Sequence, residues 1–469
     1  MIETIMQQYV FYFNIVVAVY LTIYIMILLA GTVYGAFDIL HEAKLESMHN
    51  VLEHDFYYPI SILIPMYNEG VTGIQTVENV LKQDYKLFEI IIIDDGSQDN
   101  TKQLMIDHFR LEPEYDRPIR YLVPCKKIQE VYSGRYEGRE IILISKLNGG
   151  CKADAANAGI NISNYPYILN MDGDEILQRD ALKRVAREII KDDTTIGVGG
   201  NLRISNNVSF VDAYPKNLRA GRNLLADIQS LEYSRNFAGA KILHNRWNAN
   251  LIISGGYGVF KKSALLEVGG YDPKSLGEDF EMTLRLHRHF MKEKKKYVMK
   301  YVEDSVCWTQ APSTYKDLRK QRRRWHCGLI QTLYKYRGMI FNPRYGVIGM
   351  VTLPNHIFYE LLAPTMMLLG WVAIIFSILL DTVNFPFVLI VYLIYVLFSI
   401  LLTMLSHIGN CYRKQEKVTA WALVRIFLLG LYEAFIYKIY LTLVEFFAGF
   451  QYKKVASKWE SPTRVDIKA

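Results

Sequence analysis

The sequence predicts an α/β domain with a doubly wound, mainly parallel sheet, inserted between apolar segments near the two ends of the chain. Hydrophobic residues make up 51% of the 469 residues, and the longest apolar runs lie outside the middle of the sequence. The middle instead alternates short apolar runs with amphipathic segments, which is the pattern of parallel strands connected by helices. These observations predict a membrane part and a separate ligand-binding part.

The first apolar run is Val10–Val33, which is long enough to cross a bilayer as a helix. Residues 1–8 contain no Lys or Arg, and the run is longer than the apolar core of a signal peptide. A membrane helix is therefore favoured over a cleaved leader. We expect an N-terminal transmembrane helix over residues 1–36 and a linker over 37–58.

The middle of the chain, residues 59–314, is predicted to be the α/β domain. Its buried strands are expected at Ser61–Ile64, Ile90–Ile93, Ile141–Ile144 and Tyr167–Leu169. Residues 180–190 have helical periodicity, with Asp180 as a candidate N-cap. The polar stretch Glu112–Glu140 is either an insertion or a hairpin, and its residues indicate no chemistry.

The C-terminal part is apolar again after Trp325. Membrane spans are expected near Val347–Leu379 and Phe387–His407, whereas Ala422–Phe450 carries four charged residues that are unfavourable at a bilayer centre. Basic residues on both sides of that segment favour the cytoplasm, so a re-entrant or interfacial helix pair is favoured there. The expected ranges are 315–346 for interfacial helices, 347–450 for transmembrane or re-entrant helices and 451–469 for a basic cytoplasmic tail.

Charge and cysteine content narrow the class of protein. The net charge is +7, and basic residues cluster beside the apolar segments, where they face anionic lipid headgroups. No basic face with interleaved aromatic residues is present, so nucleic acid is not an expected partner. The five cysteines are scattered without metal-ligand spacing, which favours a reducing compartment over a disulfide framework.

Three polar loops follow the predicted strands, where α/β sheets bind ligands. The first contains Pro65, Tyr67 and Glu69, and alone it is no more than a strand-to-helix loop. In the second, Asp94 and Asp95 follow four isoleucines, and paired carboxylates there are unfavourable unless they accept hydrogen bonds or bind a ligand. A capping turn built on the glycine and the later polar residues does not explain the pair, whereas contact with a base or ribose does.

The third loop is Asn148–Asn157, in which two glycines allow close backbone approach and Lys152 offers a cation to a diphosphate. A purely structural glycine turn explains the loop equally well. After the next strand, Asp172-Gly173-Asp174 places two carboxylates on the same side of an extended turn. Such oxygen ligands suit Mg²⁺ or Mn²⁺ bound together with donor phosphates.

Two further motifs lie nearer the C-terminus. Asp279, beside Glu278 at an expected helix start, is a candidate base for taking a proton from an attacking hydroxyl, and an N-cap is the structural alternative. On a helix, Gln321, Arg324 and Trp325 share one face, so that a sugar can stack on the indole and Arg324 can neutralise a diphosphate. Arg322 and Arg323 are expected to be basic interfacial residues.

In this order, the six motifs resemble those of the processive membrane glycosyltransferases of family 2, which include cellulose, chitin, hyaluronan and poly-N-acetylglucosamine synthases. The resemblance covers about Pro59 to Trp325. It implies a GT-A, Rossmann-like catalytic domain in the cytoplasm of a multi-pass plasma-membrane protein. It also implies a channel for the polymer through the membrane helices, although this chain has one N-terminal helix where hyaluronan- and cellulose-type enzymes have more.

The resemblance assigns a role to each motif. The implied roles are nucleotide binding for Pro65, Tyr67, Glu69, Asp95, Lys152, Asp172 and Arg324, metal binding for Asp172 and Asp174, catalysis for Asp279 with Glu278, and acceptor binding for Gln321, Trp325, Ser254 and Gly255. The implied partners are a UDP-sugar donor, the growing polysaccharide, the bilayer and a divalent ion, Mg²⁺ or Mn²⁺. An accessory subunit or a homo-oligomer stays open.

The leading hypothesis is inverting transfer from UDP-N-acetylglucosamine or UDP-glucose to a growing β-linked polysaccharide, coupled to its secretion. The alternative within the enzymes is transfer of a single sugar to a lipid carrier, against which the Gln321–Trp325 motif argues. A transporter or scaffold that only binds nucleotide is disfavoured, because neither additional helices nor an internal repeat is visible.

Overall fold

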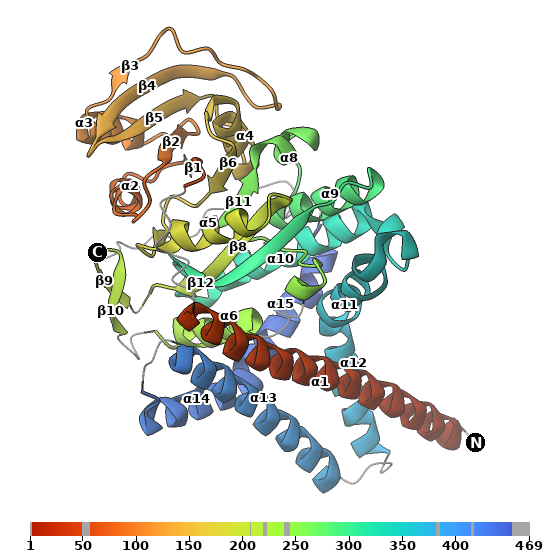
Figure 1. The fold of residues 1–469 in the computed structure, drawn as a ribbon. Helices are drawn as coiled ribbons and strands as arrows, with labels where there is room; N and C mark the ends of the chain where they lie inside the picture. The colour runs from red at the N-terminus through yellow and green to blue at the C-terminus, as the bar shows by residue number, and fades with distance from the viewer. Residues whose placement is uncertain are drawn as a thin grey trace. The chain divides into compact units, whose positions relative to one another are not determined.

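The computed structural model describes residues 2–48, 57–206, 208–218, 223–238, 244–380, 385–413 and 417–452. They form two compact units (Figure 1), described separately. The first is Met1–Met48, Asp227–Arg246 and Leu318–Val455, and the second is His49–Ala226, Trp247–Asp317 and Ala456–Ala469. Residues 49–56 of the predicted linker, 414–416 of the basic loop and 453–469 of the predicted tail lie outside the described residues.

The second unit is built on a 10-stranded sheet of order β3-β4-β5-β2-β1-β6-β11-β8-β12-β7. Its strands are β1 (Ile60–Met66), β2 (Phe88–Asp94), β3 (Glu112–Pro113), β4 (Ile128–Tyr136), β5 (Arg139–Lys146), β6 (Tyr167–Asn170), β7 (Ile176–Leu177), β8 (Thr195–Ile204), β11 (Gly258–Lys261) and β12 (Val298–Thr309). A separate two-stranded sheet pairs β9 (Val208–Val211) with β10 (Tyr214–Leu218).

The four predicted strands are confirmed as the parallel centre of this sheet. β1 pairs in parallel with β2 and β6, and β2 pairs in parallel with β5. Ile90–Ile93 of β2 are all fully buried, which explains why this run is apolar without alternation. The doubly wound prediction is therefore correct for this half of the sheet, while β11, β7 and β4 add antiparallel pairs.

Helices connect and cover these strands: α2 (Gly73–Leu81), α3 (Thr101–Phe109), α4 (Lys152–Ile162), α5 (Ala181–Lys191), α8 (Lys262–Glu267) and α9 (Glu278–Lys292). The chain runs outward from β1 to β2 and β5, and then returns through α4 to β6 on the other side of β1. Because such crossovers are right-handed, α4 covers the sheet face opposite α2 and α3. The reversal makes the gap between β1 and β6 the switch point at which such sheets bind ligands.

Two local predictions have definite outcomes. The stretch Glu112–Glu140 contains a hairpin, because β4 runs antiparallel to β5 at the sheet edge. Asp180 lies at the N-cap of α5 but makes no capping hydrogen bond. Its carboxylate instead accepts hydrogen bonds from Arg184 at 2.8 Å and Gln178 at 3.0 Å, so the capping prediction is wrong.

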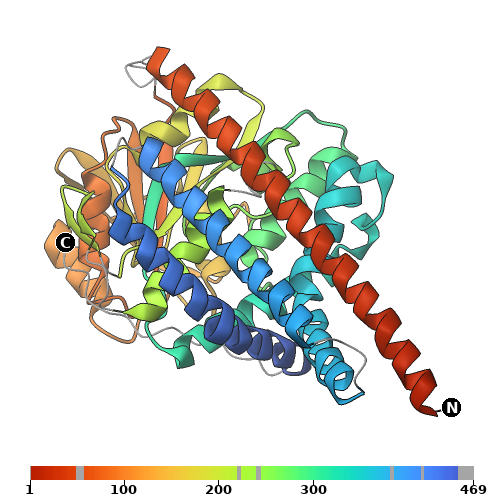
Figure 2. The same cartoon turned by 90° about the horizontal axis from the view of Figure 1, so that it is seen from below.

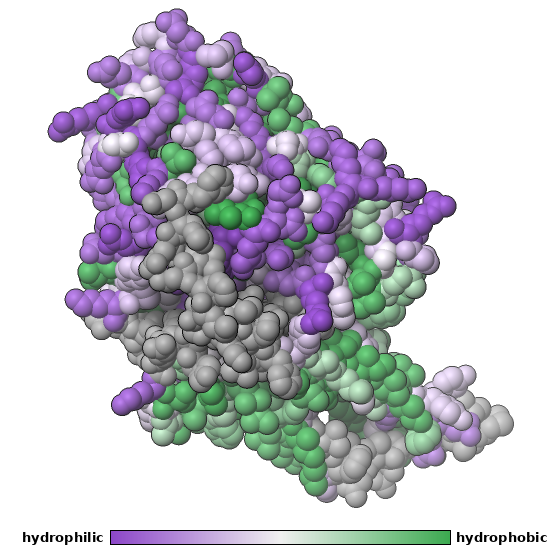
Figure 3. Space-filling view, in the orientation of Figure 1, coloured by the Kyte–Doolittle hydropathy of each residue, from purple (hydrophilic) through white to green (hydrophobic). Residues whose placement is uncertain are grey.

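The first unit consists of helices. They are α1 (Ile2–Met48), α6 (Leu224–Ala238), α10 (Tyr315–Lys335), α11 (Leu353–His356), α12 (Ala363–Leu379), α13 (Phe385–Arg413), α14 (Ala420–Tyr432) and α15 (Lys438–Phe450), with a π-helical turn, Glu433–Tyr437, joining the last two. Figure 2 shows α1, α13 and the run from α14 to α15 lying side by side. Large apolar side chains are exposed along them, and green gathers over these helices in Figure 3.

Three described helical segments are long and apolar enough to cross a membrane: Gln7–Gly31, Tyr392–Gly409 and Ala420–Phe450. A fourth crossing is available if Ile348–Leu361 and Ala363–Leu379, which meet at a 48° bend, form one span. These segments support membrane association. The helix pair expected within Ala422–Phe450 is instead one continuous helical run, and the bend lies in the earlier segment.

Helix α6 explains how that run accommodates charge. Arg425 donates to Asp227 of α6 at 2.5 Å, and Glu433 accepts from Arg235 of α6 at 2.5 Å. The sequence pattern places Asp227–Arg246 in the 59–314 domain, but this segment belongs to the first unit because these pairs tie it to the apolar helices. A buried charge is tolerated only when it is paired in this way.

Candidate active site

The loops that follow β1, β2 and β6 meet at the switch point of the sheet. The backbone N–H of Asp95 donates to Met66 O at 2.9 Å, and Gln98 N–H donates to the Asn68 side chain at 2.8 Å. A methyl group built on Gly173 would lie 3.4 Å from Pro65 O, so the Asp172–Asp174 turn contacts the first loop. The convergence expected from the parallel strands is therefore present.

Two nucleotide candidates of the first loop differ in exposure. Tyr67 is 38% exposed and is available to a ligand, whereas Glu69 is 6% exposed. The Glu69 carboxylate accepts a hydrogen bond from the Thr72 hydroxyl at 2.7 Å, and its backbone carbonyl accepts from Gly73 N–H at 2.8 Å. Glu69 thus supports the start of α2, a role that the sequence prediction does not include.

The paired acids after β2 have different partners. Asp94 accepts hydrogen bonds from Ser97 N–H and the Ser145 hydroxyl, both at 3.1 Å, so it closes the turn. Asp95 accepts from the Lys146 ammonium and, at 3.0 Å, from Gly149 N–H, and both bonds end on its Oδ1. Its Oδ2 accepts no hydrogen bond within the described part of the chain, which leaves that oxygen for a ligand.

Lys146 and Asp154 are site residues that the sequence reasoning missed. Lys146 is fully buried and contacts both Asp95 and Asp154, the latter at 2.7 Å. Burial raises the pKa of the Asp95 carboxyl, while Lys146 and the Gly149 N–H act in the opposite direction. Gly149 has no room for a Cβ, because the Asp154 carboxylate occupies that space. The glycine loop is therefore held over a buried Asp–Lys–Asp cluster.

Lys152 connects the diacidic turn to the predicted acceptor segment. Its Nζ donates to Asp172 Oδ1 at 2.5 Å and to Gly255 O at 2.7 Å. The Lys152 side chain is 11% exposed and that of Asp172 is 40% exposed, so a ligand can reach the carboxylate. Burial lowers the pKa of Lys152, but Asp172, Glu175 and Glu278 outweigh it and the pKa is raised. The ammonium thus stays charged among carboxylates.

Glu175 is a third site residue that the sequence motifs did not reveal. It is 1% exposed, and one of its oxygens accepts from Asp172 N–H at 3.2 Å. Burial and the neighbouring charges of Asp172 and Asp174 raise its pKa well above the ordinary value. Its carboxylate fills the space that a Cβ on Gly256 would need. The absence of a side chain at Gly256 in the predicted acceptor segment therefore makes room for a protein carboxyl.

The predicted base lies against the same segment. A methyl group built on Gly255 would lie 3.4 Å from the Glu278 carboxylate and 3.6 Å from Asp279 Cβ. Helix α9 has Gly277 at its N-cap position, so Asp279 lies in the first turn and is not the cap. The N-cap alternative is excluded. Asp172, Lys152, Gly255 and Asp279 form one contiguous group at the carboxyl ends of the strands.

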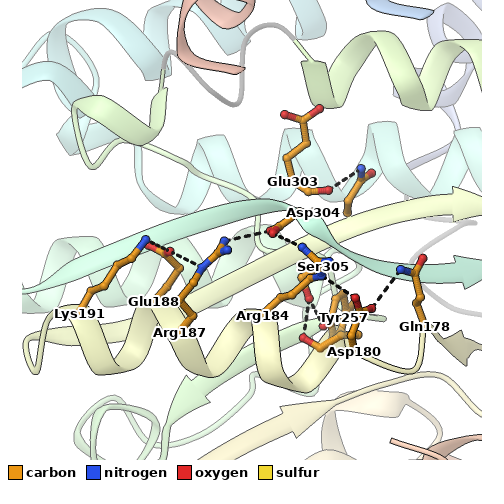
Figure 4. A network of polar contacts seen from close by, with 12 residues as sticks. Gln178, Asp180, Arg184, Arg187, Glu188, Lys191, Tyr257, Glu303, Asp304 and Ser305 are labelled. Carbon is orange, nitrogen blue, oxygen red and sulfur yellow. Dashed lines mark hydrogen bonds and ion pairs between the residues drawn. The ribbon is translucent and has the colours of Figure 1, made fainter. Parts of the chain in front are cut away.

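A network of ion pairs joins α5 to β12, and β12 contacts Tyr257 next to the predicted acceptor segment (Figure 4). Arg184 and Arg187 of α5 donate to Asp304 of β12 at 2.5 and 3.1 Å. The next residue, Ser305, donates to a backbone carbonyl of α5 at 2.7 Å and contacts the buried hydroxyl of Tyr257 at 2.5 Å. Tyr257 directly follows Ser254–Gly256, so the position of this segment is set by the packing of β12 on α5.

The predicted acceptor and diphosphate residues Gln321, Arg324 and Trp325 belong to the first unit, on α10. Trp325 is 39% exposed. The Oε1 of Gln321 is buried and has no hydrogen-bond partner among the described residues. Arg322, expected to be an interfacial cation, is 7% exposed and pairs with Glu232 at 2.6 Å, so this expectation is wrong.

Two family models match this chain. The family model described as glycosyl transferase family group 2 matches residues 167–433, more than half of the chain, and the glycosyl transferase family 2 model matches residues 61–127. The chain belongs to glycosyltransferase family 2. The two matches together cover the loops after β1, β2 and β6 and the start of α9.

Two curated relatives of this glycosyltransferase are poly-beta-1,6-N-acetyl-D-glucosamine synthases. That of Staphylococcus epidermidis is 29% identical over 328 residues, which are 70% of this chain and 67% of that protein. That of Staphylococcus aureus (strain COL) is 31% identical over 276 residues, which are 59% of this chain and 56% of that protein. The alignment thus spans little more than half the length of the second relative.

Among solved structures, a mannosyltransferase from Pyrobaculum calidifontis in complex with GDP-Man and Mn²⁺ is 15% identical, with a TM-score of 0.49 over 88% of this chain and 98% of that chain. TarS residues 1–349 of S. aureus in complex with UDP are 14% identical, with a TM-score of 0.35 over 58% of this chain and 65% of that chain.

The carboxylates of the Asp172–Asp174 turn are suitable ligands for a divalent cation. Asp172 and Asp174 supply carboxylate oxygens, the ligands that Mg²⁺ and Mn²⁺ prefer. Within the described ranges no group of three or more His, Cys, Asp or Glu side chains is arranged around one point. An ion at the two aspartates would therefore take its remaining ligands from phosphate oxygens and water, as Mg²⁺ commonly does at phosphate sites.

His287 of α9 predicts how the stability of the glycosyltransferase depends on pH. It is fully buried, its Nε2–H donates to Asn250 O at 2.9 Å, and its Nδ1 lies 2.8 Å from the Tyr297 hydroxyl. Burial lowers its pKa from 6.5 to about 4. A base whose folded pKa lies below its unfolded value contributes stability at high pH, which is lost as pH falls between these values.

We therefore expect the free energy of unfolding to fall between pH 6.5 and about 4, by up to roughly 3 kcal/mol from this group. The thermal midpoints of the wild type and His287→Gln, measured at about pH 7 and about pH 5, check this. The wild type should lose more stability on acidification than the variant. Parallel losses would show that His287 does not titrate as its burial predicts.

Proposed function

We propose that this glycosyltransferase transfers N-acetylglucosamine from UDP-N-acetylglucosamine to a growing β-linked polysaccharide, with inversion at the sugar carbon. The observation that best supports this proposal is a contiguous group of residues at the carboxyl ends of the strands, namely Asp172, Lys152, Gly255 and Asp279. The two staphylococcal relatives, which are named for a β-1,6-linked N-acetylglucosamine polymer, support this donor over UDP-glucose.

The nucleotide lies at the loops after β1, β2 and β5 in this proposal. Asp95 presents Oδ2 to the uridine, because its Oδ1 is engaged by Lys146 and Gly149. Tyr67 is exposed beside it on the first loop. Lys152 reaches the diphosphate when donor phosphates replace its contact with Asp172.

The reaction needs one proton transfer and one displacement. Asp279 takes the proton from the acceptor hydroxyl while that oxygen forms a bond to the anomeric carbon. The bond between this carbon and the diphosphate breaks, and its electron pair leaves with UDP. Asp172 and Asp174 would hold a divalent ion, which would supply charge neutralisation for the leaving diphosphate. Lys152 adds a fixed positive charge at the same place.

In this proposal the first unit binds the acceptor sugar and anchors the protein in the membrane. Trp325 of α10 offers a half-exposed indole face on which a sugar ring can stack, and Gln321 has a buried oxygen without a partner among the described residues. The candidate spans support membrane association. In this proposal the membrane is the plasma membrane and the catalytic unit lies on its cytoplasmic side, where UDP-sugars are available. A processive reaction coupled to secretion through these helices is the expected consequence.

A donor panel tests the proposal. The purified chain in lipid nanodiscs is incubated with UDP-N-acetylglucosamine or UDP-glucose, with Mg²⁺, Mn²⁺ or a chelator, and UDP release and product size are measured. We expect metal-dependent UDP release that is fastest with UDP-N-acetylglucosamine and a product of many sugars. A lipid-extractable product with one sugar would show single transfer instead, and nucleotide binding without UDP release would exclude transfer.

A further inference from the structure

Arg322 lies inside the Gln321–Trp325 motif but has an environment unlike that of its neighbours. It is 7% exposed, and its Nη1 and Nη2 donate to the two carboxylate oxygens of Glu232 of α6 at 2.8 and 2.6 Å. Such a two-pronged contact fixes the plane of the guanidinium group, which a single contact would not. The ordered cation is thus built into the fold.

Tyr437, in the candidate span Ala420–Phe450, completes the arrangement. Its hydroxyl donates to Glu232 Oε2 at 2.9 Å and lies 3.3 Å from Arg322 Nη2. Tyr437 is 1% exposed and belongs to the π-helical turn between α14 and α15. Three helical segments of the first unit, α6, α10 and the Ala420–Phe450 run, therefore meet at one guanidinium group.

The other side of that group faces the indole. The Arg322 guanidinium carbon lies 4.8 Å from the centroid of the Trp325 ring, at the i to i+3 spacing that brings helical side chains together. A cation over an aromatic face is attractive, more so when it is partly removed from water. Trp325 nevertheless stays 39% exposed, so part of the indole remains available to a ligand.

We propose that Arg322 is a positioning residue that holds Trp325 in its sugar-binding orientation and links this platform to the membrane helix through Glu232 and Tyr437. The inference rests on the acceptor role proposed for Trp325. A free indole on a helix surface would sample several rotamers, whereas one stacked on a fixed guanidinium is restricted before the acceptor arrives. Arg322 itself need not touch the sugar.

The test compares Arg322→Lys with Arg323→Lys in the full-length protein in nanodiscs. Lysine keeps the charge but has neither the planar face nor the two-pronged contact. We expect Arg322→Lys to raise KM for a β-linked oligosaccharide acceptor on the order of tenfold, with KM for the UDP-sugar unchanged. Arg323→Lys, the same change on the next residue, should behave like the wild type. Tyr437→Phe should cause a smaller rise.

Two further measurements separate this inference from the function on which it rests. Acrylamide quenching of Trp325, obtained as the difference between each protein and its Trp325→Phe version, should increase in Arg322→Lys whatever the activity. If Trp325→Ala leaves the acceptor KM unchanged, the proposed acceptor role of Trp325 is wrong. The quenching result then still shows whether Arg322 restricts the Trp325 side chain. Unchanged quenching in Arg322→Lys, or an additive effect of Arg322→Lys in a Trp325→Ala background, would overturn the positioning role.

Discussion

Asp279→Asn is expected to lower kcat for sugar transfer by about 100- to 10,000-fold, the range that a general base contributes. The asparagine side chain has nearly the same shape but cannot accept the proton of the attacking hydroxyl at neutral pH. Asp279 lies in the first turn of α9, half-buried, beside the Gly255 backbone. Asp279 is not the N-cap, and its charge contributes no more than about 1 kcal/mol at the helix start, so the fold should persist.

The measurement is UDP release by the purified variant, together with the dissociation constant for UDP. We expect unchanged UDP binding, because Asp95 and Lys152 are untouched. Glu293→Gln, an exposed acid-to-amide change at the C-cap of the same helix, is the matched control and should keep full activity. If Asp279→Asn is about as active as Glu293→Gln, Asp279 is not the base. Glu278 is then the first candidate for that role.

The centre of the fold follows from the sequence because its signals are local. Four isoleucines in β2 with no polar interruption indicate burial on both faces, which is typical of a parallel strand between two helix layers. The polar residues after each such strand then fall on one edge of the sheet. For this reason the sequence alone is enough to group Asp95, Lys152 and Asp172.

Other features depend on partners distant in sequence and escape prediction for that reason. Lys146 ends β5 as an ordinary lysine, and only the pairing of Asp94 with Ser145 places it beside Asp95. Helix α6 has mixed polar composition, which is typical of a soluble domain, although Asp227 and Arg235 pair with the apolar run Ala420–Phe450. Knowledge of the strand register would be enough to place Lys146 beside Asp95. No local sequence pattern predicts the ion pairs that Asp227 and Arg235 of α6 make.

Lys146→Met is expected to destabilise the second unit by about 3–5 kcal/mol. The Lys146 side chain is fully buried, and those of Asp95 and Asp154 are each 8% exposed. Methionine fills similar volume but leaves two carboxylates facing each other without the cation between them. Breaking a buried ion pair by removing one partner is unfavourable for this reason, even where the intact pair adds little net stability.

Thermal unfolding in nanodiscs, followed by intrinsic fluorescence, measures the effect, and a fall in midpoint on the order of 10 °C corresponds to this loss. The control is Lys183→Met, because Lys183 pairs with Asp84 at 3.1 Å while their side chains are 25% and 61% exposed. That exposed pair should contribute less than about 1 kcal/mol. Equal midpoints for the two variants would mean that the buried cluster is not coupled to folding.

The same substitution should change the pH dependence of stability and the affinity for the donor. Without Lys146, burial and the charge of Asp154 raise the pKa of Asp95 further. An acid whose folded pKa lies above its unfolded value loses stability as pH rises, so the deficit should be larger at about pH 8 than at about pH 5. Adding Asp154→Asn removes the repulsion and should recover part of the loss. Because Lys146 also orients Asp95, KM for the UDP-sugar should rise in Lys146→Met and stay unchanged in Lys183→Met.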